Sequence, residues 1–292
     1  MKRLTAIFIL SAACLAAQNN GPASDRIDPR NPLYKVTVVS HTTKAINYGH
    51  RQDPTKIGFK GTVLMPAAHG EAVVESKRGA VVIDAKFAGV GEPQRFGLNY
   101  LTYVLWAISP EGKAQNLGEL VLNGSDKGKL QVASNLQAFA LIVTAEPYYS
   151  VAQPSGVVIM ENQVLPETVG KVEEVDAKYD LLPLKPFTYD MQAGADRIQA
   201  QGGKVSMNQY EAIQSLYQAL NAIQLASAAG ADQNAPESMK KARDLYEEAR
   251  AAQAGKGDPK QVVATAREAV QAAEDARILA EKREQNPAAG SH

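Results

Sequence analysis

The fold of the C-terminal part of the chain is indicated by one stretch, residues 228–281, AAGADQNAPESMKKARDLYEEARAAQAGKGDPKQVVATAREAVQAAEDARILAE. In its second half, small apolar residues recur at alternating steps of four and three, which places them along one side of a helix. We call this set the alanine seam; it consists of Val262, Ala266, Ala269, Ala273, Ala276 and Ala280. Small side chains let two helix axes approach closely, so the seam predicts a tightly packed helical hairpin.

A further helix is expected upstream, because residues 206–228 carry apolar side chains at helical spacing between an N-cap residue, Ser206, and Gly230. The second helix should begin near Pro236, after Asn234 as the capping residue, and the third at Pro259. We therefore predict an antiparallel three-helix bundle over residues 206–285. Charged residues of the middle helix are expected on solvated faces: Lys240, Lys241, Arg243, Glu247, Glu248 and Arg250.

Short segments rich in Val and Ile, separated by Gly, Pro and Asp turns, fill the N-terminal half and predict β-strands. In one of them, Val81, Ile83 and Ala85 share a face opposite Asp84 and Lys86, as in a half-buried strand. The absence of helical patterns between the segments predicts an antiparallel, Ig-like β-sandwich. The expected strands are 34–40, 62–65, 71–77, 79–87, 100–109, 113–122, 129–134, 139–145 and 156–160.

The single tryptophan, Trp106, lies in the most apolar of these segments. A large aromatic side chain there is expected to anchor the core rather than to stack on a ligand.

The expected fold class is thus α+β in separate domains. Pro166, Pro183 and Pro186 interrupt the pattern between the two halves, where only residues 169–182 could add a strand or a short helix. The predicted organisation is a signal peptide (1–17), a flexible tether (18–32), a β-sandwich domain (33–165), a Pro-containing linker (166–205), a helical bundle (206–285) and a disordered tail (286–292).

The N-terminus has the layout of a secretory signal, because Lys2 and Arg3 precede an uncharged run from residue 4 to residue 17. Residues 10–14, LSAAC, resemble a bacterial lipobox, in which Cys14 would be lipidated, although Ser11 stands where Leu is usual. Cleavage after residue 16 or 17 would instead discard the cysteine, and a cytoplasmic protein with an apolar N-terminus is the third interpretation. We expect export to the periplasm or outer membrane of a Gram-negative-type bacterium.

Composition limits the function further. The 31 basic and 31 acidic side chains balance, so nothing in the net charge favours nucleic acid. Cys14 is the only cysteine, so a mature protein cut after it has no thiol for a disulfide, a thiolate metal site or cysteine catalysis.

We expect no catalytic residue, cofactor site or metal site. His41, His50, His69 and His292 lie apart and form no metal-binding pair, and no G-x-S-x-G motif occurs. Acidic neighbours such as Glu173–Glu174 and Glu247–Glu248 give no sign of the unequal environments that acid–base catalysis requires.

Longer runs in both halves of the chain carry a resemblance to a known family. AGADQNAPESMKKARDLYEEARAA and VATAREAVQAAEDARILAEKR resemble an alanine-rich helical domain of bacterial envelope proteins, often found before an OmpA-like domain. KAINYGHRQDPTKIGFKGTVLMP and YLTYVLWAISPEGKAQNLGELVLNGSDKGKLQV resemble the N-terminal β domain of acidobacterial-type OmpA-family proteins. The segment around Trp106 is also similar to the extracytoplasmic sandwich of anti-sigma-K factors.

This resemblance implies an envelope protein without known catalysis. The sequence ends at NPAAGSH with no segment for an OmpA-like domain, so peptidoglycan binding is expected only indirectly, if at all. The first functional hypothesis is therefore a structural or scaffolding protein that contacts envelope proteins, with membrane anchoring through Cys14 if that residue is lipidated. The second is a periplasmic ligand-binding or regulatory module that uses the β-sandwich; the partner-binding residues are not indicated by the sequence.

Overall fold

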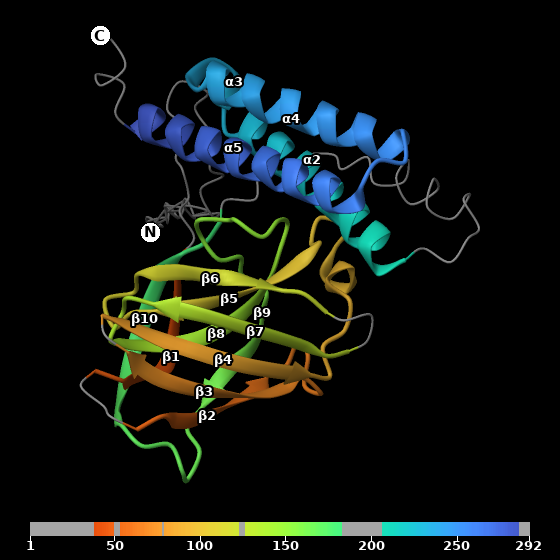
Figure 1. Cartoon of the computed structure of the whole chain (residues 1–292). Helices are drawn as coiled ribbons and strands as arrows, with labels where there is room; N and C mark the ends of the chain where they lie inside the picture. The colour runs from red at the N-terminus through yellow and green to blue at the C-terminus, as the bar shows by residue number, and fades with distance from the viewer. Residues whose placement is uncertain (1–37, 50–52, 78, 123–125, 183–205, 286–292) are drawn as a thin grey trace, which may run out of the picture. The chain divides into compact units, whose positions relative to one another are not determined.

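A computed structural model describes residues 38–49, 53–77, 79–122, 126–182 and 206–285, all within one compact unit, Val36–His292. The strands are β1 (Val38–Asn47), β2 (Thr55–Gly61), β3 (His69–Lys77), β4 (Ala80–Ala88), β5 (Thr102–Ile108), β6 (Ala114–Leu120), β7 (Gly128–Ser134), β8 (Ala138–Glu146), β9 (Val158–Gln163) and β10 (Lys171–Asp180). The helices are η1 (Pro93–Phe96, a 3-10 turn), α2 (Met207–Ala228), α3 (Ala231–Asn234), α4 (Pro236–Ala254) and α5 (Pro259–Gln285). The expected mixed α+β class, with antiparallel strands followed by helices, is confirmed (Figure 1).

The strands form one antiparallel sheet that curls until it is nearly closed (Figure 1). Its main path runs β6-β5-β8-β9-β2-β3-β4-β7, and β1 extends the sheet from the start of β8 and pairs along its length with β10. The two ends of the path are linked by side chains, because the hydroxyl of Ser134 on β7 donates to Gln115 on β6 at 2.7 Å. The strands therefore surround one core like the wall of a barrel, whereas the sequence analysis expected two facing sheets.

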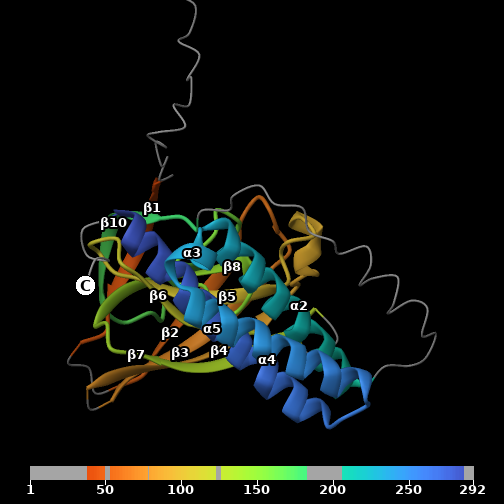
Figure 2. The same cartoon turned by 90° about the horizontal axis from the view of Figure 1, so that it is seen from above.

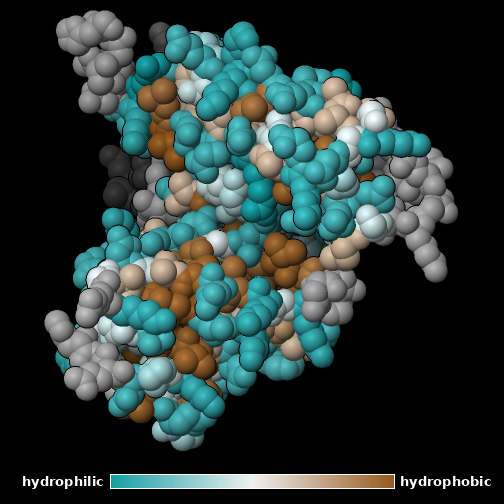
Figure 3. Space-filling view, in the orientation of Figure 1, coloured by the Kyte–Doolittle hydropathy of each residue, from teal (hydrophilic) through white to brown (hydrophobic). Residues whose placement is uncertain are grey.

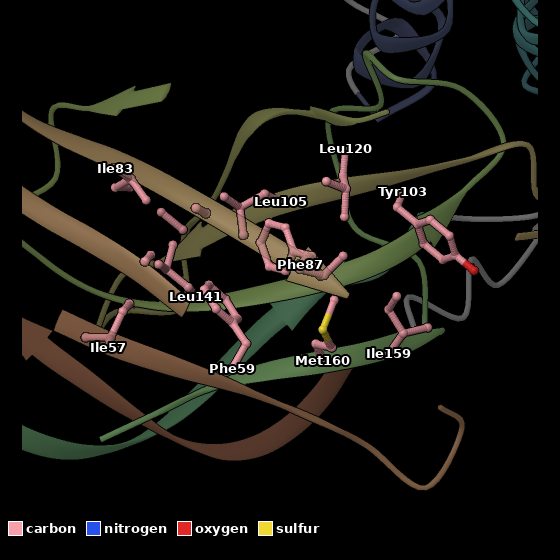
Figure 4. Close-up of a cluster of buried hydrophobic side chains, with 14 of the residues drawn as sticks. Ile57, Phe59, Ile83, Phe87, Tyr103, Leu105, Leu120, Leu141, Ile159 and Met160 are labelled. Atoms are coloured by element: carbon pink, nitrogen blue, oxygen red, sulfur yellow. The ribbon is translucent and has the colours of Figure 1, made fainter. Parts of the chain in front are cut away.

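Apolar side chains from opposite walls meet inside this curled sheet (Figure 4). Val81, Ile83 and Ala85 are fully buried while Lys86 is exposed, so the alternation predicted for β4 is confirmed. Phe59 and Phe87 pack edge to face with ring centroids 4.9 Å apart. Burial of such side chains is the main source of stability for a sheet of this kind.

The sequence analysis was wrong about residues 62–65, which form a turn. The hydroxyl of Thr62 donates to the carbonyl of Val158 at 2.7 Å and accepts from the amide of Leu64 at 3.2 Å, and Val63 is exposed. The strand is the preceding segment, β2, whose glycines and lysines weaken the apolar pattern.

The sheet also extends beyond residue 165. β10 lies within the segment assigned to the linker and pairs with β1 from Val38–Asp180 to Asn47–Lys171. Of the two options left open for residues 169–182, the strand is therefore the observed one.

The helix boundaries follow the predicted signals closely. Ser206 and Gln209 form a reciprocal capping box at the start of α2, and Gly230 adopts the left-handed conformation after its end. The start of α4 differs, because its N-cap is Ala235, with no side-chain cap, rather than Asn234. The six charged residues predicted for solvated faces of α4 are exposed.

The alanine seam of α5 is fully buried, at 0 % exposure for each of its six residues. The helix α5 lies beside both α2 and α4 (Figures 1 and 2), and the seam residues share buried clusters with residues of both helices. The predicted role of the seam in helix packing is confirmed.

The helices share a second core with the outer face of the sheet. Trp106 and Ile142, on β5 and β8, belong to the same buried cluster as Ala222, Ala273 and Ala276. Trp106 is fully buried, which confirms its predicted core position, and its indole donates to the hydroxyl of Thr144 at 2.8 Å. The sequence analysis did not anticipate this common core between the sheet and the helices.

The tightness of the seam makes a testable prediction. Replacing Ala273 by leucine inserts three heavy atoms where no space is left, so Ala273→Leu should lower the free energy of unfolding by about 1–3 kcal/mol in chemical denaturation. Ala251→Leu makes the same change on the exposed side of α4 and should leave the midpoint nearly unchanged. Equal stability of the two variants would contradict close packing at the seam.

Candidate functional site

A buried carboxylate, Glu274 on α5, links the helices to the loop between β8 and β9. It accepts hydrogen bonds from the hydroxyl of Tyr148 at 2.7 Å and the amide of Ala152 at 2.8 Å, both in the loop between β8 and β9. Arg277, one helical turn later, donates to both oxygens of Glu274, at 2.7 and 2.8 Å, and to Glu281 at 2.6 Å. The side chains of Glu274 and Arg277 are only 1 % and 2 % exposed.

This ion pair is fully satisfied, which is the condition under which buried charges are tolerated. Burial, followed by the charge of Glu274, raises the pKa of Tyr148 well above its usual range, so the phenol remains a hydrogen-bond donor. The pair fixes the position of α5 on the loop, because any other placement leaves a buried charge without its donors.

The second half of α2 is fixed to the sheet and its loops by two amide side chains. Asn221 donates to the carbonyls of Asn99 and Pro147, at 3.1 and 3.3 Å. Gln218 donates to Glu119 at 2.8 Å and accepts from the amide of Tyr149, also at 2.8 Å. These contacts hold the middle of α2 against β6 and against the loops before β5 and after β8.

A second buried carboxyl, Glu146 at the end of β8, lies on the sheet side of this junction. Its Oε1 accepts from the hydroxyl of Thr144 and from the amide of Ser155 at 2.7 Å, while Oε2 has no hydrogen-bond partner among the described residues. Burial raises the pKa of Glu146 to about 8; the two hydrogen bonds oppose the shift, and the charge of Glu274 adds to it. The carboxyl is therefore neutral at neutral pH.

Beside this junction, a cleft of about 370 Å³ opens between the start of α2 and the strands β5 and β6. We call it the junction cleft. At its base, Glu119 accepts from Thr102 at 2.7 Å and pairs with Arg267 of α5, whose guanidinium lies 4.4 Å from the ring centroid of Tyr149. The residues that line it are Glu92, Pro93, Leu101, Thr102, Tyr103, Glu119, Leu120, Val121, Leu122, Met207, Tyr210, Glu211, Gln214, Ser215, Gln218 and Arg267.

The rim of the junction cleft combines apolar and acidic groups. Val121, Met207 and Tyr210 are 48 %, 50 % and 44 % exposed. Figure 3 shows apolar surface on the sheet next to the helices. Partial burial, followed by the charge of Glu92, raises the pKa of Tyr210, so the carboxylate of Glu92 acts on a side chain of the opposite wall. The cleft can therefore bind an apolar group and, at its rim, a positive charge.

The residues singled out from the sequence do not meet at this cleft. Cys14, His50 and His292 lie outside the described residues, as does the side chain of His41. His69 is exposed at the start of β3, where its Nδ1 lies 3.0 Å from the carbonyl oxygen of Ala67.

Two absences hold for the described part of the chain. No group of three or more His, Cys, Asp or Glu side chains there could hold a metal ion. No helix in those ranges is long and apolar enough to cross a membrane.

Sequence reasoning missed Glu274, Arg277 and the acidic groups of the cleft. The one available signal was the spacing of Glu274, Arg277 and Glu281, which places three charges on a single side of α5 directly beside the alanine seam.

Comparisons with known proteins add no assignment. No protein-family model, curated protein or solved structure matches the chain.

The buried ion pair predicts an asymmetric response to mutation. Arg277→Met leaves Glu274 charged and without its cation, and should lower the free energy of unfolding by about 3–5 kcal/mol. The double variant Glu274→Gln/Arg277→Met keeps an acceptor for the amide of Ala152 and offers an N–H that the hydroxyl oxygen of Tyr148 can accept, so it should regain most of that loss. Urea denaturation measures both.

The exposed pair Arg250–Glu247 on α4 provides the matched control. Arg250→Met should have no measurable effect on the denaturation midpoint. If Arg277→Met is equally harmless, the ion pair does not hold the junction.

Glu146 predicts a dependence of stability on pH. Its pKa is about 8 in the folded protein against a usual value near 4.5, so the folded state retains a proton that the unfolded state releases between these values. The free energy of unfolding should therefore fall as pH rises from about 4.5 to about 8 and then level off. Glu146→Gln should remove this slope. The difference in free energy of unfolding between the variant and the wild type should shift in favour of the variant by about 2–4 kcal/mol between pH 4 and pH 9.

Denaturation curves at pH values from 4 to 9 measure the effect. Glu75→Gln, at an exposed carboxylate of β3, is the control and should follow the wild type. A parallel pH profile for wild type and Glu146→Gln would show that Glu146 is ionised in the fold.

Proposed function

We propose that the protein is a non-catalytic component of the bacterial cell envelope that acts as a scaffold through protein–protein contacts at the junction cleft. The observation that carries this proposal is the combination of an open, partly apolar cleft with walls held in fixed positions by Gln218, Asn221 and Glu274. A preorganised surface binds without losing conformational entropy of its own, which suits a docking site.

In this proposal the sheet has the role that the sequence analysis gave to an Ig-like β-sandwich, and the helices have that of a three-helix bundle. The helices form one wall of the binding surface instead of a separate spacer. Met207 and Tyr210 of α2 face the cleft opposite Val121 at the end of β6.

Cellular location rests on the sequence. The signal-like N-terminus supports export to the periplasm or outer membrane, with Cys14 as the lipid attachment site if the lipobox is used. The resemblance to acidobacterial-type OmpA-family proteins supports the same location. Peptidoglycan would then be contacted only indirectly, through partner proteins.

The second candidate function is binding of a diffusible ligand in the periplasm. The volume of the junction cleft, about 370 Å³, favours it, because this is within the range of small-molecule sites. A ligand-binding module would be recovered in the soluble fraction and would form no protein adducts at the cleft.

Site-specific crosslinking in the producing cells separates these functions. A photoreactive benzoylphenylalanine in place of Met207 should give protein adducts, recovered with the membrane or sacculus fraction, because Met207 is half exposed at the cleft. The same group in place of Val73, 41 % exposed on β3 and outside the lining of the cleft, should give far fewer adducts. Denaturing gels of each fraction measure the result.

The anchor is tested in the same cells with Cys14→Ser. Loss of membrane recovery and of processing would establish lipidation, whereas unchanged recovery would show that the cysteine is discarded with the signal. Soluble, adduct-free protein in all cases would contradict the scaffold and favour the ligand-binding module.

A further inference from the structure

We propose that the junction cleft binds an extended peptide segment of a partner protein that carries a lysine or arginine between apolar side chains. This inference rests on the proposed docking function and specifies the chemistry of the partner.

Acidic side chains outnumber basic ones in the lining of the cleft. Three of the lining residues are acidic, Glu92, Glu119 and Glu211, and one is basic, Arg267. Arg267 already pairs with Glu119, whose side chain is only 8 % exposed and also accepts from Thr102 and Gln218. The single cation is thus used inside the cleft and does not offset the charge at its rim.

The two remaining carboxylates stand on opposite walls. Glu92 precedes η1 on the sheet side, and Glu211 lies in the second turn of α2; both are exposed, and neither forms an ion pair with a described residue. At Tyr210, burial followed by the charge of Glu92 raises the pKa, so the field of Glu92 reaches the opposite wall. At Tyr103, burial raises the pKa, and the charge of Arg95, which lowers it, outweighs that of Glu92, which raises it. A cation placed between these walls is attracted by both carboxylates; the one positive charge of the lining is the paired Arg267, and the exposed Arg95 of η1 lies outside the lining, on the side of Tyr103.

The cleft also carries exposed apolar surface. Three of the nine large hydrophobic side chains that the described chain exposes, Val121, Met207 and Tyr210, line this one cleft. Each is close to half exposed, so the apolar groups lie along the opening and can contact side chains on either side of a central cation. A small amine would cover only part of this surface, whereas an extended peptide can place apolar side chains on several of these residues at once.

Binding of designed peptides to the purified mature protein tests the inference. The probes are fluorescein-labelled, C-terminally amidated peptides of the sequences Leu-Lys-Leu-Lys-Leu, Leu-Gln-Leu-Gln-Leu and Leu-Glu-Leu-Glu-Leu, followed by fluorescence anisotropy. The lysine peptide should bind with a Kd on the order of 100 µM, the glutamine peptide several-fold more weakly and the glutamate peptide not measurably. A shift of the Met207 methyl resonance in methionine-labelled protein should accompany binding.

Charge variants locate the effect. The double variant Glu92→Gln/Glu211→Gln should weaken the lysine peptide about 3- to 10-fold, to the level of the glutamine peptide, because two exposed attractions are lost. The matched control Glu71→Gln/Glu75→Gln removes two carboxylates from β3 and should leave the affinity unchanged. Raising the salt from 50 to 500 mM should abolish the preference for lysine by screening.

The outcomes separate this inference from the proposed function. Equal binding of the lysine and glutamine peptides, with the Met207 shift retained, would overturn the charge requirement and leave docking at the cleft intact. Equal affinity for hexylamine would overturn the peptide in favour of a small amphipathic amine. Failure of every peptide to bind would overturn the inference, and crosslinking at Met207 would then decide the proposed function independently.

Discussion

The carboxylate of Glu274 is the constraint on which the arrangement of sheet and helices depends. A charge at 1 % exposure is tolerated only when hydrogen-bond donors surround it, and here they come from two sources. Arg277 supplies them from the same helix, while Tyr148 and Ala152 supply them from the loop between β8 and β9. The helix can satisfy its own ion pair alone, but only docking on this loop completes the shell of the carboxylate. Apolar burial brings α5 to the sheet, and this shell selects one position among the many that apolar contact would allow.

The position of α5 in turn determines the junction cleft. Arg267 lies two helical turns before Glu274 and pairs with Glu119 of β6, so the ion pair at the base of the cleft depends on where α5 is held. Gln218 connects the same Glu119 to α2. Each wall of the cleft is therefore linked to the buried network by a named polar contact, and the width of the cleft is a property of the folded unit.

The sequence predicted the elements better than their assembly. The alanine seam, the N-cap at Ser206 and the alternation in β4 are local patterns, and each was confirmed because its cause is local. Residues 62–65 were misassigned because Val63 and Leu64 resemble a strand, although the hydroxyl of Thr62 closes a turn there. The spacing of Glu274 and Arg277 alone did not show that they differ from the solvated charges of α4. Their burial depends on a loop more than 120 residues earlier in the chain; Tyr148 and Glu274, which form a hydrogen bond, are 126 residues apart. The cleft could not be predicted either, because its residues come from five separate elements, η1, β5, β6, α2 and α5.

The two buried carboxyls, Glu274 and Glu146, differ from the unpaired carboxylates at the surface of the cleft in how their charge is compensated. Arg277 is the only cation among the buried residues in the described ranges; its Nε and Nη2 donate to Glu274, and its Nη1 donates to the partly buried Glu281. Glu146 has no cation, and burial and the charge of Glu274 together hold it neutral at neutral pH. The interior of the junction is thus electrically balanced, with one ion pair and one protonated acid. Glu92 and Glu211 differ because both are exposed to water at the rim of the cleft. Carboxylates that are charged, unpaired and next to apolar surface have free energy to gain from a cationic partner, and in this molecule that combination is found at the cleft.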